Sequence, residues 1–256
     1  MSFKHIISRD NSLFKQLKRI ADSSRERRKL GETLLDGAHL VEAYLEAFGE
    51  PKLLIIPEGE STAEVTYLTQ QLADIPTVMF PTLMFQELTP VASPTGILAL
   101  VKTPNIAAPA ELDFVLMLED IQDPGNLGSM LRTAAAAGVD AVYLSEGCTD
   151  AWSPKALRGG QGAQFVLPIV ERANLVEFAH AFEGQVLATM LNGTFIYAMD
   201  MTVPTAIAIG NEGNGLSDAL QQAATYQVTI PITGVESLNA AAATSICLFE
   251  RVRQKL

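Results

Sequence analysis

The segment Thr205-Ala-Ile-Ala-Ile-Gly-Asn-Glu-Gly-Asn-Gly-Leu216 joins an apolar strand to a glycine-rich turn and the start of a helix. The chain then repeats this order, with a strand expected at Gln227–Pro231, a loop over Ile232–Asn239 and a small-residue helix over Ala240–Arg253. Because both loops follow strands and precede helices, we expect their backbone N–H and C=O groups to face one crevice. Taken alone, a run of Gly and Asn indicates no more than a turn, since both residues adopt positive φ readily.

A third segment of this kind lies upstream. The buried-type strand Phe114–Leu118 is followed by Asp120-Ile-Gln-Asp-Pro-Gly-Asn-Leu-Gly-Ser-Met-Leu-Arg-Thr-Ala134, which turns through Asp-Pro-Gly and enters a helix that ends at Gly138. Asn126 falls at the expected helix start, where it would serve as a cap, and Arg132 lies about a turn and a half further on. Each residue alone could be a cap or a surface charge; three matched segments in one order indicate a site.

Strands and helices alternate through the second half of the chain. Further strands are expected at Ala141–Leu144, Phe165–Ile169 and Gln185–Met190, and helices after Ser153 and over Leu175–Phe182. This β-α repetition predicts an α/β fold whose sheet is mainly parallel and has helices on both faces.

The first hundred residues predict a smaller α/β domain. Its elements are helices over Ser8–Ala21, Ala38–Phe48 and Ala63–Leu72, and strands over Lys52–Ile56, Thr77–Phe80 and the end of Ser93–Val101. A segment rich in Pro and Ala follows and is typical of a linker. We therefore expect a domain over residues 1–103, a linker over 104–111 and a second domain over 112–256.

Charge is distributed unevenly along the chain. The net charge is −11, which argues against a polyanionic ligand, but residues 1–29 carry nine basic and three acidic side chains, +6 in all, and the remainder carries −17. Such asymmetry is typical of a localised contact with a polyanion. A solvated helix face would explain the charges equally well. After the first expected helix, Arg25, Arg27, Arg28 and Lys29 are expected to lie in a charged connector.

The composition excludes several classes of protein. No apolar run approaches the roughly 20 residues of a membrane span, and the N-terminus lacks the apolar core of a signal peptide. Two cysteines without metal-ligand spacing suit the cytoplasm and predict no metal site. The three histidines lie outside the three segments, which disfavours a hydrolase triad, and the glycine spacing fits neither a Walker loop nor a dinucleotide fold.

The three segments closely resemble the three motifs of the SpoU (TrmH-type) RNA ribose methyltransferases. More weakly, Ser8–Lys15, Leu34–Val41 and Ser93–Ala99 resemble the ribosomal-protein-like substrate-binding domain that precedes many SpoU catalytic domains. One departure occurs between Lys155 and Gly162, where the family commonly has a small Ser or Ala, then Met or Ala, then Gly. This chain has Arg158-Gly-Gly-Gln-Gly162, which we expect to keep the loop tight but to alter contacts with the substrate.

The resemblance implies a C-terminal trefoil knot, a homodimer and S-adenosylmethionine-dependent methylation of a ribose 2′-oxygen in RNA. Ribosomal RNA is the favoured substrate; transfer RNA, or a non-catalytic RNA-binding relative, are the alternatives. It implies that the cofactor contacts Thr189, Gly210, Ile230 and Leu238. The polar residues expected around the 2′-hydroxyl are Asn126, Arg132, Glu212, Ser237 and Asn239. Because a guanidinium is hard to deprotonate, we interpret Arg132 as an oxyanion stabiliser or phosphate clamp, and Glu212 as an orienting partner of Arg132 or Asn126.

Overall fold

The computed structural model describes residues 3–89 and 94–256, and contacts divide the chain into two units. The N-terminal unit runs to Pro104 and also includes Trp152–Phe165; the C-terminal unit comprises Asn105–Ala151 and Val166–Leu256. Packing therefore groups Trp152–Phe165 with the N-terminal unit, whereas the sequence-based boundary at 112 assigns it to the second domain. The boundaries at 103 and 112 stay a prediction, because a grouping of contacts does not test independent folding.

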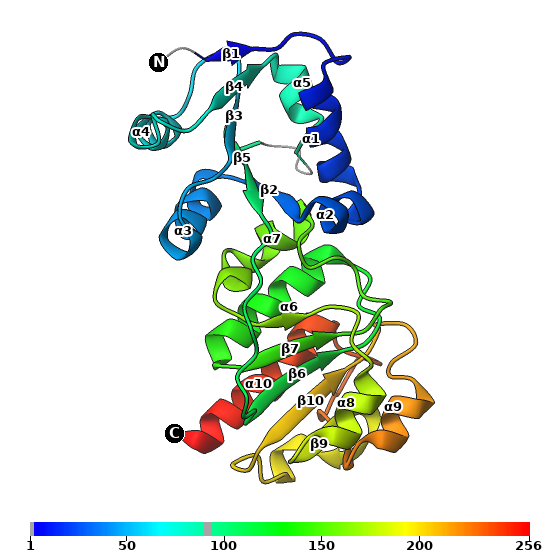
Figure 1. The fold of residues 1–256 in the computed structure, drawn as a ribbon. Helices are drawn as coiled ribbons and strands as arrows, with labels where there is room; N and C mark the ends of the chain where they lie inside the picture. Colours follow the sequence, from blue (N-terminus) through cyan, green and yellow to red (C-terminus); the bar gives the residue numbers. More distant parts are fainter. Residues whose placement is uncertain (1–2, 90–93) are drawn as a thin grey trace. The chain divides into compact units, whose positions relative to one another are not determined.

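The N-terminal unit is built on a mixed five-stranded sheet (Figure 1). The strand order is β1-β4-β3-β5-β2, in which β1, β3 and β4 are parallel and β5 runs antiparallel to β3 and β2. The strand bounds are β1 Lys4–His5, β2 Glu32–Asp36, β3 Leu53–Pro57, β4 Thr77–Phe80 and β5 Leu98–Lys102. The expected turn before β5 starts at Ser93, which lies outside the described residues.

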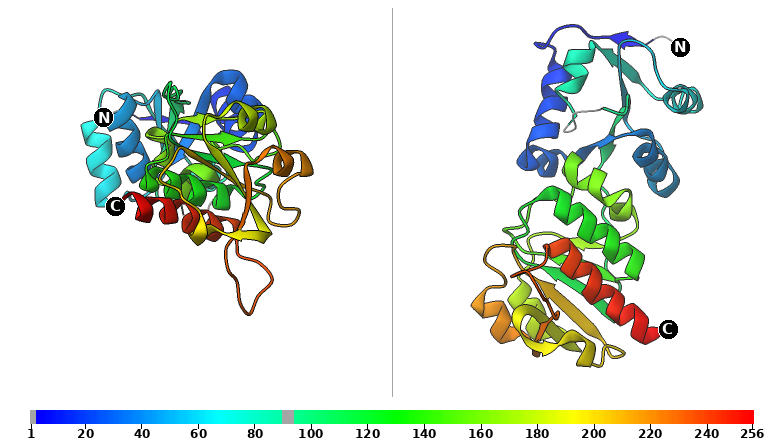
Figure 2. Two further views of the ribbon diagram at one scale, coloured as in Figure 1. Left: turned by 90° about the horizontal axis from the view of Figure 1, so that it is seen from below. Right: turned by 180° about the vertical axis from the view of Figure 1, so that it is seen from behind.

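Helices cover both faces of this sheet (Figures 1 and 2). On one face lie α1 (Ser12–Asp22), α2 (Ser24–Leu30) and α5 (Thr82–Gln86), and on the other lie α3 (Ala38–Phe48) and α4 (Ala63–Gln71). The apolar residues expected along α1 face the sheet, with Phe14, Leu17 and Ile20 buried in one cluster with strand residues. The amphipathic pattern thus predicts the buried face, although the helix begins at Ser12 rather than Ser8.

The expected charged connector is instead a second helix, α2. Ser23 caps it by accepting a hydrogen bond from the Glu26 N–H, and the helix ends at Gly31 in the left-handed conformation. Arg27 is only 5% exposed, and its Nη1 donates to the Ile20 carbonyl at 2.6 Å and to the Ala21 carbonyl at 2.9 Å. Arg27 therefore satisfies the C-terminal carbonyls of α1 and is a structural residue, not a solvated charge.

The segment with the unusual glycines forms α7 (Pro154–Gly160) and the short 3₁₀ helix η1 (Ala163–Phe165). A β-carbon added at Gly160 would lie 2.1 Å from the side-chain oxygen of Gln164, a fully buried residue whose amide donates to the Ala156 carbonyl at 3.1 Å. The glycine thus makes room for a buried glutamine within the segment. The strand expected at Phe165–Ile169 is wrong, because pairing occurs only at β8 (Ile169–Val170).

The C-terminal unit contains a six-stranded sheet in the order β11-β9-β10-β6-β7-β8, and every pair in it is parallel. The other strand bounds are β6 Phe114–Leu118, β7 Ala141–Leu144, β9 Gln185–Phe195, β10 Thr205–Ile209 and β11 Tyr226–Thr229. One face is covered by α6 (Pro124–Ala137) and α10 (Ala240–Lys255), and the other by α8 (Leu175–Ala181) and α9 (Asp218–Ala223) (Figures 1 and 2). A short 3₁₀ helix, η2 (Ile196–Ala198), follows β9.

This arrangement confirms the predicted α/β class with a mainly parallel sheet and helices on both faces. Because the strands are parallel, the loops that leave β6, β9, β10 and β11 all emerge at one edge of the sheet. The trefoil knot stays a prediction. In the described part of the chain, no helix combines the length and apolarity needed to cross a membrane.

Candidate active site

The loop after β6 shapes the first wall of the site. Asp123, not Asn126, caps α6: its carboxylate accepts a hydrogen bond from the Asn126 N–H at 2.8 Å, and Pro124 occupies the first helical turn. Asp followed by Pro is the usual signature of a helix start, so the sequence did contain this signal. Because Asn126 is the third residue of α6, its side chain is available for bonds to other loops.

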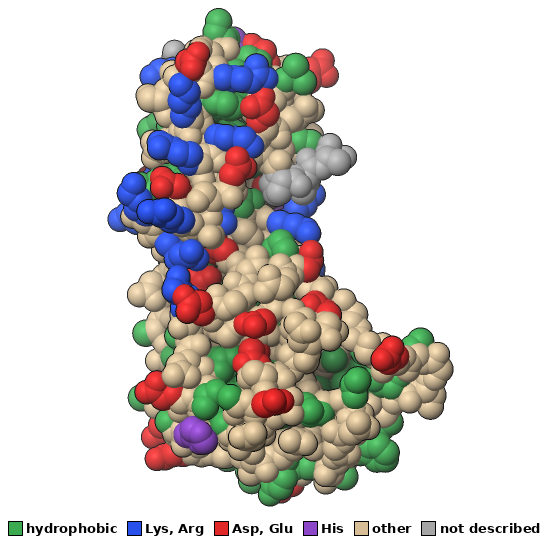
Figure 3. Space-filling view, turned by 90° about the vertical axis from the view of Figure 1, so that its right-hand side faces the viewer, with side chains coloured by type: hydrophobic (Ala, Val, Ile, Leu, Met, Phe, Trp, Pro, Cys, Tyr) green, Lys and Arg blue, Asp and Glu red, His purple; other side chains and the backbone are tan. Residues whose placement is uncertain are grey.

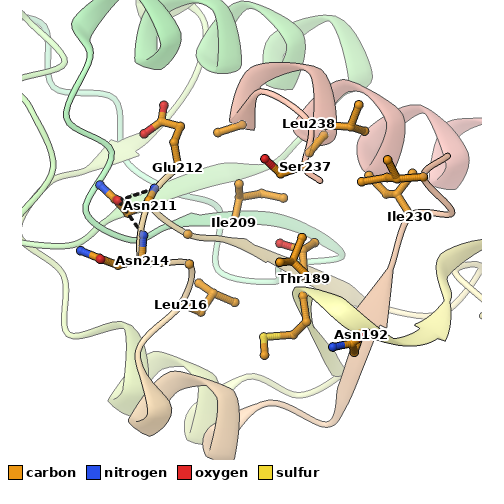
Figure 4. A pocket seen from close by; sticks show the side chains of 18 of the residues that line it. Thr189, Asn192, Ile209, Asn211, Glu212, Asn214, Leu216, Ile230, Ser237 and Leu238 are labelled. Atoms are coloured by element: carbon orange, nitrogen blue, oxygen red, sulfur yellow. Dashed lines mark hydrogen bonds between the residues drawn. The ribbon is translucent and has the colours of Figure 1, made fainter. Parts of the chain in front are cut away.

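The loop Gly210–Gly215, which we call the glycine loop, is closed by backbone hydrogen bonds between Asn211 and Gly215 at 2.9 and 3.2 Å. The Asn211 side-chain oxygen accepts from the N–H groups of Gly213 and Asn214 (Figure 4), while its Nδ2 donates to the Asp120 carbonyl at 2.9 Å. A β-carbon at Gly210 would lie 2.3 Å from the Gly215 carbonyl carbon, so the closed loop requires glycine there. Asn211 thus ties the glycine loop to the loop after β6, a role that we did not assign from the sequence.

Three of the expected catalytic residues, each from a different motif, form one chain of hydrogen bonds. Asn126 Nδ2 donates to Glu212 Oε1 at 2.6 Å, and Asn239 Nδ2 donates to Asn126 Oδ1 at 3.2 Å. Asn239 Oδ1 also caps α10 by accepting from the N–H groups of Ala241 and Ala242 at 2.9 and 3.3 Å. Since Glu212 accepts from one end of the Asn126 amide and Asn239 donates to the other, the orientation of this amide is determined.

The other two expected catalytic residues lie outside this chain. Ser237 is exposed and lines the pocket described below, while Arg132 is exposed on α6. Arg132 lies six positions after Asn126, which corresponds to about 9 Å along the helix. Within residues 3–89 and 94–256, neither Ser237 nor Arg132 has a side-chain hydrogen bond, and the carboxylate of Glu212 pairs with Asn126 rather than with Arg132.

A pocket of about 670 Å³ opens between the middle of β9 and the loops that follow β10 and β11 (Figure 4). An irregularity in the sheet exposes its floor: Gln227 of β11 pairs with Ala188 of β9, but the next residue, Val228, pairs with Thr194. Residues 189–193 therefore have no register partner on β11, and four of them line the pocket. The adjacent Asn192-Gly193 pair is a sequence signal typical of such a bulge.

All four residues expected to contact the cofactor line this pocket: Thr189, Gly210, Ile230 and Leu238. Figure 4 shows Thr189, Ile230 and Leu238 on the side of the pocket away from the glycine loop. The Thr189 hydroxyl donates to the Ala208 carbonyl at 2.9 Å, so it fixes the backbone at this point. The sequence did not single out Met190, Ile209 and Leu216, which add apolar surface to the lining.

The lining is suited to a nucleoside that carries positive charge. Apolar side chains alternate with exposed loop backbone, an environment that can hold an adenine between apolar surfaces and bind its edge through peptide groups. Among the described residues of the lining, Glu212 and Glu236 are the charged side chains, and none is Lys, Arg or His. The residues present therefore fit a cofactor with a cationic sulfonium and ammonium group. The described residues contain no group of three or more His, Cys, Asp or Glu that could hold a metal ion.

Known proteins resemble this chain over nearly its whole length. It is 34% identical to a Bacillus subtilis 23S rRNA (guanosine(2553)-2′-O)-methyltransferase, over 96% of this chain and 98% of that protein. It is 32% identical to a Shewanella oneidensis 23S rRNA (guanosine-2′-O-)-methyltransferase, over 88% of this chain and 98% of that one. The crystal structure of AviRb, a SpoU methyltransferase from Streptomyces viridochromogenes in complex with the cofactor AdoMet, superposes with a TM-score of 0.83 at 28% identity, over 96% of this chain and 98% of AviRb.

A profile described as the SpoU rRNA Methylase family matches residues 113–249, which contain all three motifs, the polar chain and the pocket. The match covers more than half of the chain. The chain belongs to the SpoU rRNA methylase family.

Proposed function

We propose that this protein transfers the methyl group of S-adenosylmethionine to the 2′-oxygen of a ribose in ribosomal RNA. The observation that carries this proposal is that two features lie side by side in the C-terminal unit. One is the pocket, whose charged lining residues are acidic, and the other is the hydrogen-bonded chain of Asn239, Asn126 and Glu212. Glu212 belongs to both. Relatives that match almost the whole chain, the N-terminal unit included, are 23S rRNA 2′-O-methyltransferases by name, which favours ribosomal over transfer RNA.

S-adenosylmethionine supplies a methyl group that is already activated by the positive charge on sulfur, so the protein's tasks are alignment and control of the hydroxyl proton. Thr189, Gly210, Ile230 and Leu238 would hold the cofactor. Glu212 and Asn239 hold the Asn126 amide in one orientation, next to the pocket, and thereby preorganise the polar wall that faces the ribose. Ser237 lines the same pocket and contributes an additional hydroxyl to this wall.

Arg132 is assigned to the substrate RNA. It is exposed and has no acidic partner in the described residues, so its guanidinium is free to bind a phosphate next to the target or to stabilise the developing oxyanion. Replacement of Arg132 by Ala should lower the turnover rate by about 10²-fold, the scale of losing one preorganised donor, while the Kd for S-adenosylmethionine stays unchanged. Wild-type turnover of the variant at saturating RNA would remove Arg132 from the site.

The decisive experiment measures methyl transfer from labelled S-adenosylmethionine to transcripts of 23S rRNA and to bulk transfer RNA, followed by mapping of 2′-O-methylated nucleotides. Methylation of the 23S transcript alone supports the proposal, and methylation of transfer RNA alone selects the alternative substrate. Binding of both cofactor and RNA without transfer would identify a non-catalytic relative.

We also infer a homodimer that forms through α10. The helix buries Ala240 and Thr244 inside the unit, so part of its small-residue face is used internally. Ala242, Ile246 and Phe249 follow one another at i, i+4 and i+7, and Phe249 is 46% exposed, which gives the helix a second apolar stripe. Sedimentation should show a dimer at micromolar concentration and a monomer for Phe249→Asp; a monomeric wild type would contradict this inference.

We propose a cytoplasmic location. It is supported by the two cysteines, Cys148 and Cys247, which are both free thiols, as is usual in a reducing compartment.

A further inference from the structure

The N-terminal unit presents a basic surface on α1 and α2. Figure 3 shows Lys and Arg side chains gathered over these helices. Residues 1–29 carry a net charge of +6 in a chain whose remainder carries −17, so this is the part of the molecule with an excess of positive charge. The composition alone left open whether these charges are a polyanion contact or a solvated face.

The ion pairs of this surface show which of its cations already bind acidic groups of the protein. Lys15 pairs with Asp10 at 2.8 Å, and Lys18 pairs with Asp22 at 3.0 Å. Arg9 likewise pairs with Glu87 at 2.5 Å, and Arg27 is buried against the end of α1. These four cations are already occupied by groups of the protein.

Three arginines of the same helices have no acidic partner in the described part of the chain: Arg19, Arg25 and Arg28. All three are exposed, and Arg28 makes only a long 3.4 Å contact with the Ser24 hydroxyl. Arg25 and Arg28 lie three residues apart on α2 and therefore share one face of that helix. Arg19 lies in the last turn of α1, next to the junction at Ser23 that joins the two helices.

The junction is held by hydrogen bonds between the two helices, which makes this group of arginines a defined surface. Arg27 binds two carbonyls of α1 from within α2, and Ser23 ends one helix and caps the next. The apolar side of α1 is buried in the core through Phe14, Leu17 and Ile20, so α1 does not present a hydrophobic face that could enter a lipid surface. Guanidinium groups are the side chains best suited to bind phosphate in a planar, bidentate manner.

We propose that Arg19, Arg25 and Arg28 form a docking surface for the phosphate backbone of the substrate RNA. The proposal rests on the RNA methyltransferase function proposed above and adds where the RNA is held. Phosphate contacts supply affinity but no base recognition. This surface would therefore increase the affinity for RNA of any sequence without selecting the target nucleotide.

The test compares two triple variants of the full chain that remove the same charge. The first is Arg19→Ala with Arg25→Ala and Arg28→Ala; the control is Arg9→Ala with Lys15→Ala and Arg172→Ala, in which each replaced cation is paired with an acid. Binding of a fluorescein-labelled, single-stranded RNA 20-mer of mixed sequence is followed by anisotropy from 50 mM to 500 mM KCl. At about 0.7 per contact, the slope of log affinity against log salt should fall by about two units in the first variant.

The control variant should keep the wild-type slope, because acid-paired cations release few counterions from RNA. If the two proteins bind equally when extrapolated to 1 M salt, a slope change of two makes the first variant bind about 100-fold more weakly at 0.1 M salt. An unchanged slope, or equal changes in both variants, would overturn the proposal. Binding of the wild type to anionic lipid vesicles rather than to RNA would also overturn it.

Failure of this surface can be told apart from failure of the proposed function. The wild type and both variants are assayed in parallel for binding of S-adenosylmethionine and for methyl transfer to the 23S transcript at saturating RNA. If the wild type methylates RNA while the salt slope of the first variant is unchanged, the docking surface is wrong and the enzyme assignment stands. If the wild type binds no RNA at all, the function itself is wrong.

Discussion

Replacing Glu212 distinguishes a residue that positions Asn126 from a residue that takes the proton of the 2′-hydroxyl. The 2.6 Å hydrogen bond from Asn126 to the Glu212 carboxylate is charge-assisted, a class that contributes about 1.5–3 kcal/mol, against about 0.5–1.5 kcal/mol for a neutral bond. Gln at this position can still accept from Asn126, so it forfeits only the difference, about 1 kcal/mol. Ala forfeits the whole bond, about 2 kcal/mol or more, and releases the amide to rotate.

If the whole of this lost hydrogen-bond energy raises the activation free energy, kcat should fall about fivefold in Glu212→Gln and about 30-fold or more in Glu212→Ala. The assay is methyl transfer to 23S transcript at saturating RNA and cofactor, with the Kd for S-adenosylmethionine measured separately because Glu212 lines the pocket. Glu183→Gln, which removes the same charge from an exposed position outside the pocket, is the matched control. If Gln proves as damaging as Ala, with a loss of 10²-fold or more, Glu212 is acting as the base and the positioning argument is refuted.

Three further predictions concern stability and reactivity. Arg27→Ala should lower the free energy of unfolding by about 2–3 kcal/mol, because two carbonyls lose their donor, while Arg28→Ala should change it by less than about 0.5 kcal/mol; urea titration measures both. The hydrogen bond from Arg251 lowers the pKa of Asp113 in the folded protein. The ionised Asp113 therefore contributes to the free energy of unfolding above its pKa in the unfolded chain, and this contribution is lost as the pH falls through its pKa in the folded protein. In thermal melts between pH 3 and 7, the Tm of Asp113→Asn should therefore fall less than that of the wild type as the pH drops below about 4. Burial raises the pKa of the Cys247 thiol to about 12, so a thiol reagent at pH 8 should label this residue only after unfolding; rapid native labelling would contradict its burial.

The sequence predicts most accurately the elements whose apolar pattern has one interpretation. The strands at Phe114–Leu118 and Ala141–Leu144 are found with the expected bounds, because continuous apolar runs between turn signals suit a parallel sheet that is covered on both faces. The apolar run Phe165–Ile169 misleads because Val166 is 70% exposed and Pro168 cannot donate to a sheet. Burial is decided by neighbours distant in sequence, and a local pattern does not contain them.

The same distinction holds for the site. The motifs predict which residues gather, and Glu212, Asn126 and Asn239 do form one chain. They do not predict which atoms pair, because an amide or carboxylate has several possible partners until the loops are placed. The helix α2 was missed for a different reason: a short helix of charged residues has no apolar periodicity, and only Ser23 marks its start.

The side chain of Asn239 stabilises both the start of α10 and the polar chain of the site, so the order of one can be measured through the other. Its oxygen holds the first free N–H groups of α10, on Ala241 and Ala242, while its nitrogen holds Asn126. Fraying of the first turn of α10 and loss of the polar chain are therefore one event, with one opening free energy. Hydrogen exchange at those two backbone amides should consequently slow when a ligand orders the site, even though neither alanine has a side chain that could take part in the chemistry.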